Sequence, residues 1–110
     1  MQGGVGMTKK RKKIKKDMLE QLKNQGVTGE HYKDLINDYM SLWDIKNELI
    51  KDIEEKGVSI KYQNGKNQFG YKKNDSIPEL NKVSAQMLKI LSELGLKPSP
   101  AEEDDNDFIL

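Results

Sequence analysis

The clearest hydrophobic pattern of the chain lies between residues 74 and 99. Ser76 and Glu79 have the S-x-x-E spacing of a capping box, in which each side chain accepts a free N–H of the first turn. Gly95 suits the left-handed position that follows a helix. The pattern predicts a helix over residues 78–94. Its apolar residues form one face more than ~100° wide: Leu80, Val83, Met87, Leu88, Ile90, Leu91 and Leu94.

A longer amphipathic stretch precedes it, from Thr28 to Lys56. Thr28 is a suitable N-cap, and Glu30 places a negative charge in the first turn, where the helix dipole favours it. Gly57 ends the pattern. A helix of this length extends ~40 Å at ~1.5 Å per residue. At ~100° per residue its apolar row contains Tyr32, Ile36, Tyr39, Trp43, Ile50 and Ile53, flanked by Leu35, Leu42 and Leu49.

Between these helices, residues 58–73 change to a period of two. The alternating apolar residues are Val58, Ile60 and Tyr62, and then Phe69 and Tyr71. Asn64-Gly65 is the strongest two-residue turn signal for a β-hairpin. We expect a hairpin here, with an irregular crossover as the alternative. Four lysines lie beside these aromatic residues, which leaves two interpretations open: a nucleic-acid contact, or a solvated connector whose aromatic residues pack against the helices. These lysines are Lys61, Lys66, Lys72 and Lys73.

The beginning of the chain is strongly basic. Ile14, Met18, Leu19 and Leu22 give a thin apolar stripe that Gly26 ends, which predicts a basic helix or arm over residues 9–26, after a disordered leader at 1–8. We expect its cations to contact the phosphate backbone of a nucleic acid, since no aromatic residue nearby offers to read bases. The alternative is a solvated, self-repelling segment. The candidate DNA-binding residues are Lys9, Lys10, Arg11, Lys12, Lys13, Lys15 and Lys16.

The end of the chain has the opposite charge. Residues 98–110, PSPAEEDDNDFIL, contain five acidic residues and bury too little apolar area to become ordered alone. We expect an acidic flexible tail. Its hydrophobic end, Phe108, Ile109 and Leu110, is either a short motif that binds a partner protein or part of a solubilising tail.

Composition narrows the possible functions. A chain of 110 residues with 34% charged and 35% hydrophobic residues makes one small domain. It has no cysteine and one histidine, His31, so thiol chemistry, histidine-based triads and most zinc sites lack the necessary residues. The acidic row Asp44, Glu48 and Asp52 is more typical of a solvated helix surface than of a metal site. We expect a non-enzyme with no cofactor, no metal and no membrane span.

The two helices differ in length, which bears on assembly. The helix at 78–94 is too short to cover the apolar face of the longer one, and exposed apolar patches usually mark interfaces. We therefore expect an all-α homo-oligomer with an oligomerisation core over residues 27–97; the alternative is a monomeric three-helix unit. The predicted interface residues are Tyr32, Leu35, Ile36, Tyr39, Leu42, Trp43, Leu49, Ile50, Ile53, Leu80, Met87 and Leu91.

Several segments together resemble a known family. Glu93 to Ser99, ELGLKPS, is similar to the C-terminal signature of phage terminase small subunits of the P27 type, and Asn74 to Pro78 resembles the start of the helix before it. Tyr39 to Trp43 resembles the Tyr…Trp pair of the family's long helix, and Gly57 to Gly70 its glycine-containing connector. The resemblance covers residues 28–99. The chain departs from the family in turning acidic after Ser99.

The resemblance implies a non-catalytic component of a DNA-packaging motor in the cytoplasm of a bacterial host. Such small subunits assemble into rings, bind double-stranded viral DNA and recruit or regulate the large subunit, which carries the ATPase and nuclease. Two other classes stay open from the residues alone. One is a small transcriptional regulator, in which the basic helix and the start of the long helix form a helix-turn-helix. The other is a helical protein-interaction adaptor without a DNA role.

Overall fold

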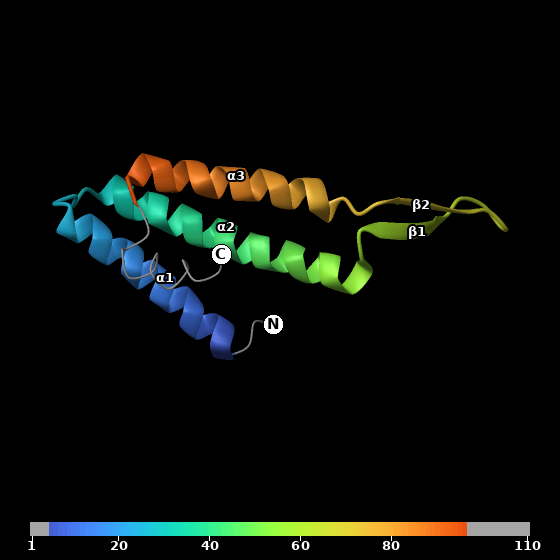
Figure 1. Cartoon of the computed structure of the whole chain (residues 1–110), viewed down its shortest axis with the longest axis horizontal. Coiled ribbons are helices and arrows are strands. Elements are labelled where there is room, and N and C mark those ends of the chain that lie inside the picture. Colours follow the sequence, from blue (N-terminus) through green and yellow to red (C-terminus); the bar gives the residue numbers. More distant parts are fainter. Residues whose placement is uncertain (1–4, 97–110) are drawn as a thin grey trace, which may run out of the picture. The chain divides into compact units, whose positions relative to one another are not determined.

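The computed structural model describes residues 5–96, which form three helices and one two-stranded antiparallel hairpin (Figure 1). The predicted mostly helical fold with a hairpin is therefore confirmed for these residues. The acidic tail and its hydrophobic end, residues 98–110, lie outside them. In chain order the elements are α1 (Val5–Asn24), α2 (Glu30–Lys56), β1 (Ser59–Gln63), β2 (Phe69–Lys73) and α3 (Ser76–Leu94).

The first helix begins earlier than the sequence predicts. α1 is already helical at Val5, ahead of Lys9, so the second half of the expected leader belongs to the helix. Met18 and Leu22, one helical turn apart, are its buried apolar residues, whereas Ile14 and Leu19 of the predicted stripe are partly exposed.

The described residues divide into two compact units, and α2 and α3 contribute to both. One unit holds residues 5–36 and 90–96, and its buried apolar side chains are Met18, Leu22, Ile36 and Leu94. The other unit holds residues 37–89, and its buried apolar side chains are Met40, Trp43, Val83 and Met87.

The buried stripes are narrower than the apolar faces in the sequence. In α2 the buried positions Ile36, Met40 and Trp43 follow i, i+4, i+7 spacing, and Met40 is absent from the predicted interface row. In α3, Leu88 is 67% exposed, although the pattern places it on the apolar face. The reason is geometric: Leu88 lies five residues after Val83, which is ~140° around the helix axis.

Glycines end all three helices, as the sequence predicts. Gly95 has a φ of 69°, and the N–H of Leu96 donates to the carbonyl of Leu91 at 3.1 Å, which is the 6→1 bond of a Schellman motif. α1 ends in the same way at Gly26, with a φ of 79°. The amide of Gln25 donates to the carbonyl of Gly95 at 3.2 Å and so joins these two helix ends.

The start of α3 differs from the predicted capping box. The Asn74 Oδ1 accepts the N–H of Ser76 at 2.9 Å, so Asn74 is the N-cap. The N–H of Ile77 donates to the carbonyl of Asn74 at 3.0 Å, because the next residue, Pro78, has no N–H to donate. The hydroxyl of Ser76 donates instead to Asp52 at 2.7 Å. The Ser76 hydroxyl, which the sequence assigns to the cap, is thus hydrogen-bonded to Asp52 on α2 instead.

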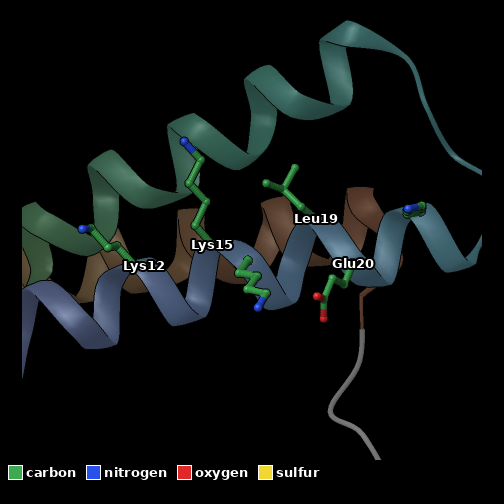
Figure 2. Close-up of a pocket in the computed structure, with 6 residues that line it drawn as sticks. Lys12, Lys15, Leu19 and Glu20 are labelled. Carbon is green, nitrogen blue, oxygen red and sulfur yellow. The ribbon is translucent and has the colours of Figure 1, made fainter.

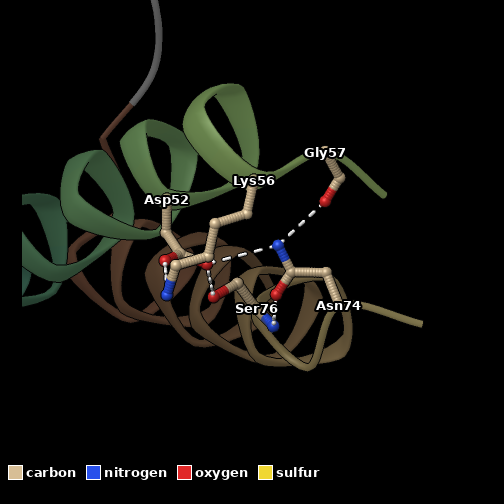
Figure 3. Close-up of polar contacts among 5 residues, drawn as sticks. All are labelled: Asp52, Lys56, Gly57, Asn74 and Ser76. Atoms are coloured by element: carbon tan, nitrogen blue, oxygen red, sulfur yellow. Dashed lines mark hydrogen bonds and ion pairs between the residues drawn. The ribbon is translucent and has the colours of Figure 1, made fainter. Parts of the chain in front are cut away.

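Asn74 is the buried polar centre of this region. It is 2% exposed, and its amide donates both to Asp52 Oδ2 at 3.2 Å and to the carbonyl of Gly57 at 2.9 Å (Figure 3). Its own N–H donates to the carbonyl of Val58 at 2.8 Å. All of its polar groups therefore have partners, which removes the penalty of burying them. One side chain holds the end of α2, the base of the hairpin and the start of α3 together.

Asp52 completes this network. Its Oδ1 accepts from the ammonium group of Lys56 at 2.8 Å, one turn along α2. The hydrogen bond from Lys56, followed by those from Ser76 and Asn74, lowers the pKa of Asp52 to about 2. The same pair raises the pKa of Lys56. The carboxylate is thus stabilised in its charged form by donors from both helices.

The hairpin forms with a different turn from the one that its sequence favours. A two-residue turn at Asn64-Gly65 would pair Gln63 with Lys66. In the structure Gln63 pairs with Phe69, and residues 64–68 form a longer loop closed by an Asn64 N–H to Gln68 carbonyl bond of 2.8 Å. The Val58–Asn74 backbone bond continues the same register beyond the base of the ribbon. The buried cap of α3 therefore fixes the register from the base, and the loop accommodates it.

This register separates the aromatic residues. Residues directly opposite each other share a face, so Tyr62 lies with Gly70 on one face, and Phe69 and Tyr71 lie with Lys61 on the other. A register set by the short turn would have placed Tyr62 on the same face as Phe69 and Tyr71. The hairpin consequently has no single apolar face to bury against the helices.

Candidate nucleic-acid interface

The predicted DNA-binding residues all lie on α1. Lys9, Lys10, Lys12, Lys13 and Lys16 are exposed, while Arg11 and Lys15 are partly buried. Among the described residues, none of the six lysines forms an ion pair with a carboxylate. Within residues 5–96, no carboxylate partner has to be displaced before these ammonium groups bind an external anion.

Part of this basic surface is concave. An open hollow of about 320 Å³ follows one side of α1, with apolar lysine stems and Leu19 in its walls. Figure 2 shows the ammonium groups of Lys12 and Lys15 on one side of the helix and the carboxylate of Glu20 on the other. The residues lining the hollow are Lys12, Lys15, Lys16, Leu19, Glu20 and Lys23.

The structure adds one cation to the predicted set. Lys23 is exposed and lies in the same hollow as Lys16, seven residues earlier. Two turns of a helix return a side chain almost to the same direction, so the i, i+7 spacing of Lys16 and Lys23 predicts a shared face. The run of basic residues at 9–16 ends before Lys23 and therefore does not include it. Glu20 lies between the two and reduces the positive charge at this end of the row.

A second basic surface lies on the hairpin. Phe69 and Tyr71 are 57% and 71% exposed, and Tyr62 is 42% exposed. The predicted alternative, in which these aromatic residues pack against the helices, is therefore wrong. The ammonium group of Lys61 lies 4.5 Å from the centroid of the Phe69 ring, a cation–π distance. Basic and aromatic side chains thus share one exposed face of the ribbon.

The predicted oligomerisation residues have mixed exposure. Three of them, Ile36, Trp43 and Met87, are buried within the chain itself. The others are partly exposed, and partial burial raises the pKa of the Tyr39 phenol. Ile45, on α2, is 46% exposed and was not in the predicted set. The partly exposed residues are Tyr32, Leu35, Tyr39, Leu42, Leu49, Ile50, Ile53, Leu80 and Leu91.

Residues 5–96 offer neither an evident metal site nor a membrane span. Within this part of the chain, no group of three His, Asp or Glu side chains is arranged to hold a metal ion. No helix there combines the length and the apolar character that crossing a membrane requires. The acidic row on α2 is divided, because Asp52 is engaged with Lys56, Asn74 and Ser76.

The fold and these surfaces define a small, mostly helical protein with basic, exposed faces. Over residues 12–103 the sequence matches the family of phage terminase small subunits, and the chain belongs to that family. The match begins within α1, so it includes most of the basic helix as well as α2, the hairpin and α3. No curated protein and no solved structure is detectably similar to the chain. The family places the protein in bacteriophage DNA packaging, and its members are generally non-catalytic.

Proposed function

We propose that this protein is the DNA-recognising small subunit of a phage terminase and that it recruits or regulates the large ATPase-nuclease subunit in the bacterial host cytoplasm. The observation that carries the DNA-binding part is the row of exposed lysines on α1, which extends from Lys9 into the region that matches the family from residue 12 onward. Each lysine near a phosphate releases a counterion, which makes the binding salt-dependent and independent of sequence.

Self-association is the second part of the proposal. Burial within the chain uses the stripe around Met40 and Trp43 and leaves neighbouring apolar residues such as Leu42 and Ile45 in contact with solvent. A chain of this size gains stability when such residues pack against another copy. We infer a homo-oligomer, in the form of a ring, through the partly exposed side of α2. Its contact with the large subunit is assigned to residues 98–110.

The DNA-binding part is tested by removing charge from α1. The variant Lys9→Gln, Lys12→Gln, Lys13→Gln, Lys16→Gln is compared with the native protein by fluorescence anisotropy on a labelled DNA duplex, from about 50 to about 200 mM salt. Because four side chains no longer neutralise a phosphate, the slope of log K against log[salt] becomes less negative by about 3.6. The decrease in affinity is similar for unrelated duplex sequences.

The matched control removes the same charge from exposed lysines of α2 and α3. The variant Lys33→Gln, Lys51→Gln, Lys82→Gln, Lys89→Gln has the same net charge as the α1 variant. We expect its affinity and its salt slope to stay near those of the native protein. Equal decreases in the two variants would show a non-specific effect of net charge, and unchanged binding by the α1 variant would refute the assignment to α1.

Self-association is tested by light scattering. We expect the native chain to be oligomeric at micromolar concentration, and Leu42→Ser with Ile45→Ser to shift it towards the monomer, because both side chains point away from the buried stripe of α2 and are in contact with solvent. A monomeric native chain at that concentration refutes this part of the proposal. Circular dichroism of the variant confirms that its helices are retained.

A further inference from the structure

The hairpin of residues 59–73 has a composition unlike that of the helices around it. From Val58 to Lys73 the chain contains four lysines and no acidic residue. On the face that carries Phe69 and Tyr71, register places Lys61 and Lys73 beside them, and Lys66 lies in the loop at the tip. Within its own unit the ribbon extends past the end of α2 and the start of α3 (Figure 1). We call Lys61, Phe69, Tyr71 and Lys73 the open face.

The open face is not covered by the other face of the ribbon or by a helix. Tyr71 is 71% exposed and Phe69 57%, whereas Tyr62 on the opposite face lies over the backbone of Gly70. A Cβ added at Gly70 would come within 2.8 Å of the Tyr62 hydroxyl, so that ring is already in contact with the strand. The two most exposed aromatic rings of the ribbon, Phe69 and Tyr71, therefore lie on the side that also carries Lys61.

We propose that the open face of the hairpin is a second DNA-contacting surface, distinct from α1. Charge complementarity identifies the occupant, because an uninterrupted set of cations suits a phosphate backbone. Exposed aromatic rings beside those cations suit bases, since every base presents a π-face. This inference rests on the proposed DNA binding of the chain and adds to it stacking on the bases or sugars, for which α1 has no aromatic residue.

The dimensions of the ribbon agree with this occupant. A five-residue strand is ~17 Å long. The major groove of duplex DNA is ~12 Å wide and admits a two-stranded ribbon. The register, fixed from Asn74 at the base, keeps the aromatic residues and Lys61 on one side, so they approach such a groove together.

A protein partner fits the same face less well. Lysine is depleted in protein–protein interfaces, and the apolar residues of this ribbon are divided between its two faces. Addition of a strand from a second copy is disfavoured by lysines along the strands, which typically prevent edge-to-edge pairing. Self-association through the hairpin is therefore treated as a competing outcome of the test.

The test separates charge from stacking. In the variant Lys66→Gln with Lys73→Gln, we expect the salt slope for duplex DNA to become less negative by about 1.8. Raising the salt concentration from about 50 to about 200 mM lowers the affinity of both proteins. The factor of this decrease is about ten times smaller for the variant than for the native protein. Tyr71→Ser should weaken binding about tenfold at every salt concentration without changing the slope, because stacking releases no counterion.

Two control variants match these changes. Lys51→Gln with Lys89→Gln removes the same charge from exposed helix positions, and Leu88→Ser removes an apolar side chain with a similar exposure, 67% against 71% for Tyr71. Neither should alter DNA affinity or salt slope. The variants are also measured on single-stranded DNA of the same sequence. Weaker binding to either form supports the proposal, and a larger decrease on the single strand identifies unpaired bases as the contact.

The failures are distinguishable. If the α1 variant loses affinity and the hairpin variants do not, this inference is wrong and the proposed function stands. If the native protein binds DNA with no dependence on salt, the proposed function itself fails. If the hairpin variants change only the oligomeric state seen by light scattering, the ribbon is an interface between copies and the inference is overturned.

Discussion

The substitution Asn74→Ala tests the buried network at the start of α3 most directly. The change removes an N-cap, which costs about 1 kcal/mol. It also removes a hydrogen bond to the charged Asp52, worth about 1.5–3 kcal/mol, and a neutral one to the carbonyl of Gly57, worth about 0.5–1.5 kcal/mol. These contributions share one side chain and do not add fully. We expect the free energy of unfolding to fall by about 3 kcal/mol.

Urea denaturation followed by circular dichroism measures this decrease. For a chain of this size, a decrease of about 3 kcal/mol also lowers Tm by more than about 10 °C. Asn74 fixes the base of the hairpin, so hydrogen exchange should report a second effect. The backbone amides of the Ser59–Lys73 pair lose protection more than those of residues 36–43 in α2.

Asn81→Ala is the matched control on the same helix. Asn81 is exposed, and alanine has the higher helix propensity, so this variant should be unchanged or slightly more stable, within about 0.5 kcal/mol. If the two asparagine variants lose equal stability, the buried network around Asn74 does not hold the hairpin to the helices. Asn74 would then not fix the register of the hairpin either.

Three other predictions concern stability. Asp52→Asn should be less stable than the native protein at pH 7. Folding lowers the Asp52 pKa from 3.8 to about 2, so the native carboxylate becomes protonated as pH falls from 4 towards 2. The difference in the free energy of unfolding between the two proteins, measured by urea titration, should therefore decrease over this pH range. A difference independent of pH would contradict the charged role of Asp52. Gly57→Ala should cost about 1–2 kcal/mol by the same assay, because Gly57 has a φ of 84°; a neutral effect would show that the backbone relaxes. Trp43→Ala should cost about 3–5 kcal/mol and Leu88→Ala under about 1, since Trp43 is 7% exposed and Leu88 67%; similar thermal shifts for both would contradict the assigned core.

The approximate positions of the helices and their C-terminal ends followed from local chemistry. The end of α3 at Gly95 could be predicted because a glycine after a hydrophobic run satisfies the last carbonyls through its own backbone and that of Leu96. The family signature at residues 93–99 overlaps this helix end, so one short segment carried both structural and functional information. The match over residues 12–103 confirmed the family.

The basic surface was predictable in composition but not in arrangement. The sequence identified the lysines of α1, yet only the helix geometry added Lys23 and placed Glu20 among them. On the hairpin, the sequence identified Phe69 and Tyr71 without deciding whether they are covered. Their exposure depends on which face the register assigns to them, and that register is set outside the hairpin.

The sequence alone therefore determined the elements, their C-terminal ends at glycines and the sign of the charge on each segment, because propensity, glycine termination and charge act over a few residues. Tertiary structure decided which residue caps α3, which register the hairpin adopts and which apolar residues are buried. The reason is competition from distant groups. Asp52, 24 residues away, takes the hydroxyl of Ser76, and Asn74 takes over the cap and joins Val58 to fix the ribbon. No local rule ranks a hydrogen bond between distant residues against a capping box or a two-residue turn.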